Sequence, residues 1–165
     1  WTAPHEIAHL SIPFVGKINM WFSEGYASYL QWIILQKQGE YSEEEIRTKL
    51  EEKLKLVKKY YDTEESFIDA SSRLKSEYNY PALYWGGACY FFQVDSILHL
   101  DYNTSLLEVI SKYQKTGRMK DDTLDELIQS LDEIIGSNAF AELLDEFMTE
   151  DANKLILRTE CITSF

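Results

Sequence analysis

The pattern of apolar and polar residues predicts helices along nearly the whole 165-residue chain. Two capping boxes, at 42–45 and 123–126, place a hydroxyl residue three positions before a glutamate and mark helix starts. Residues 62–79 show no strong period, so we expect a loop with at most a short helical turn, and 150–165 is ambiguous. No series of alternating residues indicates strands, so the expected fold is all-α with about six to eight helices. The expected helices cover about 4–10, 23–37, 42–60, 81–99, 104–117, 123–136 and 137–149.

Two segments are too apolar for helices that lie on the surface. Residues 18–36 contain a single charged side chain, Glu24, and residues 78–94 contain none. Helices that are apolar on all sides are buried. The second segment is not a membrane span, because it is short and includes Asn79, Pro81 and Gln93.

Length and composition fit a single domain, residues 1–165, with a sizeable core. The net charge of −12 excludes nucleic acid as a partner, because no basic stripe is available to neutralise phosphates. It equally disfavours binding to an anionic membrane surface. Two cysteines, Cys89 and Cys161, are too few for a disulfide framework or a cysteine zinc site. They could pair, but Cys89 lies in an apolar run and is expected to pack as a small hydrophobic residue.

The first candidate for chemistry is the motif His5-Glu6-x-x-His9. On a helix, residues four apart lie on one face, so the two imidazoles can bind one Zn²⁺. Glu6 lies beside them, where it can take a proton from a zinc-activated water. The alternative is an amphipathic helix that merely carries two polar histidines.

Glu24 is the natural third ligand. A buried carboxylate without a partner is costly, and a metal ion removes that cost. Two histidines and one glutamate, with water in the fourth position, form a catalytic zinc set. The alternative is that Glu24 lies in the first turn of its helix and only complements the helix dipole. That alternative explains its position but not its isolation.

Together these residues resemble a known family. The motif His5-Glu6-x-x-His9, fourteen intervening residues, Glu24 and the surrounding string 21–29 (WFSEGYASY) resemble the gluzincin metallopeptidases. Within them, the resemblance is to glycyl-aminopeptidase-like enzymes related to the zinc aminopeptidases. The zinc aminopeptidases have eighteen residues where this chain has fourteen, which points to a side branch.

The resemblance also implies an oxyanion donor. Tyr84, sixty positions after Glu24, begins a Tyr-Trp-Gly-Gly-Ala string similar to the family motif whose tyrosine stabilises the tetrahedral intermediate. Gly86 stands where the family often has lysine. The alternative is that Tyr84 only packs in the core, as most of the eleven tyrosines should. Tyr80 and Tyr78 are the next candidates for the oxyanion donor.

Two further polar residues have possible roles near the motif. Ser28 lies one helical turn after Glu24, where related enzymes place a residue that hydrogen-bonds the first histidine. It could equally be a small residue that eases helix packing. His99 lies far from the motif in sequence and is expected to be structural or on the surface.

The resemblance implies the helical half of a thermolysin-like catalytic domain that uses Zn²⁺ to hydrolyse a peptide or protein substrate. A β-rich half that aligns the peptide would then precede this chain in the same protein, and the chain alone would show little turnover. The alternative is a non-catalytic helical scaffold derived from a metallopeptidase. An intact Glu6 favours the enzyme, since a scaffold needs no general base.

Overall fold

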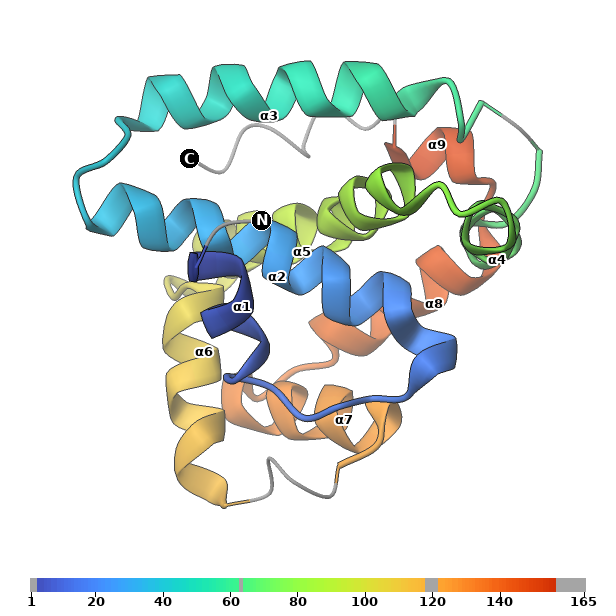
Figure 1. Cartoon of the computed structure of the whole chain (residues 1–165). Coiled ribbons are helices and arrows are strands. Elements are labelled where there is room, and N and C mark those ends of the chain that lie inside the picture. Colours follow the sequence, from blue (N-terminus) through green and yellow to red (C-terminus); the bar gives the residue numbers. More distant parts are fainter. Residues whose placement is uncertain (1–2, 63, 118–121, 157–165) are drawn as a thin grey trace.

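The computed structural model describes residues 3–62, 64–117 and 122–156 and confirms the all-α fold (Figure 1). Two short 3₁₀ helices, Lys17–Asn19 and Gln114–Thr116, supplement the α-helices. The predicted number of six to eight was too low, because α4 and α9 form where none was assigned. The nine α-helices of the described residues are α1 (Ala3–His9), α2 (Met20–Lys37), α3 (Glu43–Lys58), α4 (Phe67–Ser76), α5 (Tyr80–Tyr102), α6 (Leu106–Tyr113), α7 (Leu124–Ile135), α8 (Ala139–Thr149) and α9 (Ala152–Ile156).

Helix α4 corrects the expected loop at 62–79. Ser66 caps it by accepting a hydrogen bond from the Asp69 N–H at 3.2 Å. Its buried positions, at 67, 70, 71 and 74, follow the helical period. Two of those positions hold the small residues Ala70 and Ser71, so the apolar stripe was weak in the sequence.

Two predicted helix starts were also inaccurate. Helix α2 begins at Met20 rather than at Ser23, because the preceding 3₁₀ turn runs directly into it. The Ser23 hydroxyl is buried inside the helix and caps nothing. At α8, Ser137 does accept the Ala139 N–H at 3.2 Å, but the main cap is the Asp132 carboxylate of α7. It accepts the N–H groups of residues 140 and 141 at 2.9 and 3.1 Å.

Helices α2 and α5 run through the middle of the molecule, with α3 along one side and α7 and α8 on the other (Figure 1). Their backbones meet at two glycines. A Cβ built on Gly25 would lie 2.3 Å from the carbonyl carbon of Gly87, and one on Gly87 would lie 2.0 Å from the Trp21 oxygen. Only glycine fits on both sides of such a contact.

Aromatic side chains fill the core around this crossing. The Trp21 ring lies 5.1 Å from Phe67 and 5.9 Å from Tyr90, and Phe22 lies 4.8 Å from Phe91. Offset and edge-to-face pairs at these distances add to the burial of apolar area. Cys89 is fully buried in this core, as expected, while Cys161 lies outside the described residues. None of the described helices is both long enough and apolar enough to cross a membrane.

Candidate active site

Helix α1 carries His5 and His9 one turn apart on the face that packs against α2. The His5 side chain is 2% exposed and that of His9 is 28% exposed. Their rings meet edge to face, with centroids 5.0 Å apart. The helical spacing therefore places both imidazoles beside each other, one buried and the other partly open to solvent.

Glu24 reaches both histidines from α2. Its Oε2 atom lies 3.3 Å from Nε2 of His5 and 3.6 Å from Nε2 of His9. Glu24 is the fifth residue of α2, and the first turn of that helix holds no acidic residue. A role in complementing the helix dipole is therefore not what places this carboxylate.

The charges in this cluster are interdependent. Burial works to raise the pKa of Glu24, but hydrogen bonds with His5 and His9 outweigh it and lower that pKa to about 2. The hydrogen bond with Glu24 raises the pKa of His9, against the opposing effect of burial. Glu24 is therefore an ionised carboxylate held between two imidazoles.

The three groups fit a divalent cation. Their ligand atoms all lie within 4.8 Å of one another. Ligands bound about 2.0–2.1 Å from a tetrahedral zinc ion lie roughly 3.3 Å from one another. The Glu24 carboxylate already lies 3.3 and 3.6 Å from the two Nε2 atoms, so the observed spacing requires little rearrangement around an ion.

Glu6 is on the solvent side of the same helix. It lines a cleft of about 420 Å³ together with His9 and Glu24. The cleft wall also includes residues for which the sequence predicted no part in a site. They are Ile12, Pro13, Phe14, Gly16, Lys17, Met20 and Ser23. Phe14 is 76% exposed, and its place between Pro13 and Gly16 in a short loop was the available signal.

Tyr84 lies near this cluster but does not line the cleft. Its ring centroid is 6.4 Å from that of His5. Burial, and then the negative charge of Glu24, raise its pKa to about 12, so the hydroxyl keeps its proton and can donate. Tyr80 lies one turn away, 6.1 Å from Tyr84, and Tyr78 is 77% exposed. Tyr84 is thus the tyrosine of these three whose ring is next to His5.

The structure explains why position 86 holds glycine where the family often has lysine. A Cβ at Gly86 would lie 2.0 Å from the Tyr61 hydroxyl, which occupies the adjacent space and donates to the Ala82 oxygen at 3.0 Å. A lysine would need that space. Tyr61 is fully buried, so the position is closed to a long side chain.

The two other polar residues, Ser28 and His99, differ in their surroundings. His99 Nδ1 lies 2.6 Å from the Thr104 carbonyl oxygen, a structural contact at the end of α5. Ser28 is 2% exposed on α2. Its burial suits a small residue in helix packing.

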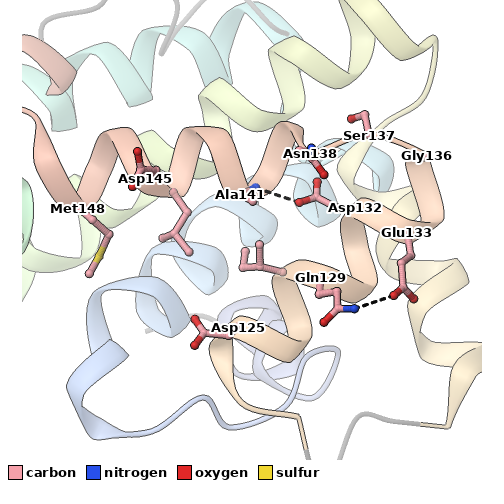
Figure 2. A pocket seen from close by; sticks show the side chains of 12 residues that line it. Asp125, Gln129, Asp132, Glu133, Gly136, Ser137, Asn138, Ala141, Asp145 and Met148 are labelled. Carbon is pink, nitrogen blue, oxygen red and sulfur yellow. Dashed lines mark hydrogen bonds between the residues drawn. The ribbon is translucent and has the colours of Figure 1, made fainter.

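A larger cavity of about 750 Å³ lies between α7 and α8 (Figure 2). Its walls carry Asp125, Asp132 and Asp145 but no histidine or cysteine. Asp132 is already engaged in capping α8. This space is therefore not a second centre of the His–Glu kind.

A helical fold with a His–His–Glu cluster beside a cleft is the arrangement expected in the helical part of a metallopeptidase domain. Residues 15–91 match the family model of the M61 glycyl aminopeptidases, a family of zinc peptidases. The match spans slightly less than half of the chain, and it includes Glu24 and Tyr84 while the His5–His9 motif precedes it. It confirms the resemblance to gluzincin-type metallopeptidases and supports a metallopeptidase-type hydrolase role. No curated protein and no solved structure matches the chain.

Proposed function

We propose that this chain provides the catalytic helices of a zinc-dependent peptidase, aminopeptidase-like or related. In this proposal His5, His9 and Glu24 hold Zn²⁺, Glu6 is the general base and Tyr84 stabilises the oxyanion. The main support for this proposal is that the ligand atoms of His5, His9 and Glu24 lie close together, next to a cleft that Glu6 also lines. A zinc ion held there would acidify water and polarise a peptide carbonyl.

The protein groups supply the proton transfers. Glu6 faces the open cleft, so it can accept a proton from the attacking water and later deliver it to the leaving amine. Its exposure also means that substrate binding must exclude water around it. Tyr84, whose raised pKa keeps its hydroxyl protonated, donates to the oxygen on which negative charge develops.

The Glu6→Gln variant separates an enzyme from a scaffold. Because Glu6 lies outside the His–His–Glu cluster, the variant should bind zinc with unchanged stoichiometry. Loss of a general base should lower the rate of peptide hydrolysis by about two to four orders of magnitude. The measurement is zinc content by elemental analysis, together with cleavage of a peptide library by the protein that carries this chain. Stoichiometric zinc with no cleavage by the unmodified protein would favour the scaffold.

A further inference from the structure

The cleft at the candidate centre does not end at Met20 and Phe14. It shares Phe14 and Gly16 with a cavity of about 620 Å³ that reaches the start of α7. That cavity in turn shares Leu144 and Met148 with the space of about 750 Å³ between α7 and α8. Shared wall residues place the three spaces next to one another in a row from Glu24 to α8, and we call this row the long groove.

The long groove has an apolar floor that is open to solvent. Phe14 is 76% exposed and Met148 is 48% exposed, although both are large hydrophobic side chains. Val15, Leu124 and Leu144 line the space between them. Exposed apolar surface of this kind, continuous with a candidate catalytic centre, is typical of a binding groove.

Two carboxylates at the end of the long groove that is far from Glu24 favour a positively charged ligand. Asp125 of α7 and Asp145 of α8 lie on opposite sides of the space between these helices (Figure 2). Within the described residues neither carboxylate has a hydrogen-bond or ion-pair partner, whereas Asp132 caps α8 and Glu133 accepts from Gln129 at 3.0 Å. The basic residues along the walls of the three described cavities, His9 and Lys17, both lie at the end near Glu24.

We propose that the peptide substrate extends from the candidate centre along the long groove. An apolar side chain then packs against Phe14, and a lysine or arginine side chain binds between Asp125 and Asp145. This inference rests on the proposed function and specifies its substrate class. Charge complementarity favours a cationic peptide, because the unpartnered charges at the far end are carboxylates and the chain carries a net charge of −12.

Peptide binding without cleavage tests this inference. The zinc-loaded Glu6→Gln protein is titrated with fluorescein-labelled dodecapeptides of alanine and serine that contain one phenylalanine. Lysine or glutamine is placed at each position in turn, and affinity is measured by fluorescence anisotropy. Lysine should bind about two- to five-fold more tightly than glutamine at a restricted set of positions, the range for a solvent-exposed ion pair. Added salt should reduce that preference.

Variants test whether residues of the long groove cause the preference for lysine peptides. Combined Asp125→Asn and Asp145→Asn changes should remove the lysine preference, while Phe14→Ala should weaken lysine and glutamine peptides equally. Asp101→Asn, a matched change of an exposed carboxylate outside the groove, should leave the preference intact. Equal binding of lysine and glutamine peptides at every position overturns the inference, as does a preference that survives the double change. If this Asp125-dependent binding is found but the unmodified protein, with Glu6 intact, cuts no peptide, the proposed function alone is refuted.

Discussion

Gly25→Ala and Gly87→Ala test whether the backbone contact between α2 and α5 controls both stability and the candidate centre. Both glycines lie inside helices, where alanine is intrinsically favoured by about 1 kcal/mol. Propensity alone therefore predicts more stable variants. The packing predicts the reverse, so the sign of the change distinguishes the two effects.

The magnitude follows from the contact distances. A Cβ at Gly25 would lie 2.3 Å from a backbone carbon of α5, whereas ordinary contact begins at 3.4 Å. The helices would have to move apart by about 1 Å, because no flexible side chain can yield. Overpacking of a rigid core typically costs about 1–3 kcal/mol, and this must exceed the gain in propensity. A Cβ 2.3 Å from a backbone atom places the cost near the upper end of that range, so after the propensity gain of about 1 kcal/mol we expect a net loss of about 2 kcal/mol in the free energy of unfolding for Gly25→Ala.

Urea unfolding followed by tryptophan fluorescence measures this change, with an unchanged m-value as the check on two-state behaviour. Ser72→Ala is the matched control, since it introduces alanine at an exposed position inside α4 and should be neutral or slightly stabilising. Because Glu24 is adjacent to Gly25, zinc affinity should fall in parallel with stability. A Gly25→Ala protein as stable as the unmodified one would refute the reasoning.

Two further predictions concern the candidate centre. Replacing His5 and Glu24 together by alanine should abolish zinc binding, whereas His99→Ala should not. Elemental analysis after zinc loading measures this. Unchanged zinc content in the double variant would contradict the assigned ligands. Tyr84→Phe should retain zinc and lower kcat by about two to three orders of magnitude with little change in KM, because an oxyanion donor acts mainly in the transition state; steady-state kinetics that show only a raised KM would remove Tyr84 from this role.

Much of the fold could be predicted because local signals were strong. The capping boxes at 42–45 and 123–126 form as expected, with both reciprocal hydrogen bonds present. Helix α4 could not be predicted in the same way, since Ala70 and Ser71 occupy buried positions that only tertiary packing identifies. The start of α2 was predicted at Ser23, because a serine before an acidic residue is typical of a helix cap. The helix begins earlier, at Met20, because it continues the preceding 3₁₀ turn.

The candidate site, like the fold, could be predicted only where the signal is local in sequence. The spacing of His5 and His9 and the isolation of Glu24 are local features, and the structure brings these residues together. That they bind zinc stays a prediction. The long groove could not be predicted, because Phe14 and Met148 lie far apart in the chain and only tertiary packing places both in the wall of one cavity.

Helix α1 has a consequence for the dynamics of the centre. Within the described residues it spans Ala3–His9, and its main packing partner is α2. Just after α1 ends, the Ser11 and Tyr26 hydroxyls form a 2.5 Å hydrogen bond that ties the end of α1 to α2. Two proposed ligands, His5 and His9, thus lie on a helix docked against α2, which carries the third proposed ligand, Glu24. Zinc capture and the docking of α1 become one equilibrium, and amide hydrogen exchange in α1 should slow in proportion to zinc occupancy while α5 is unaffected.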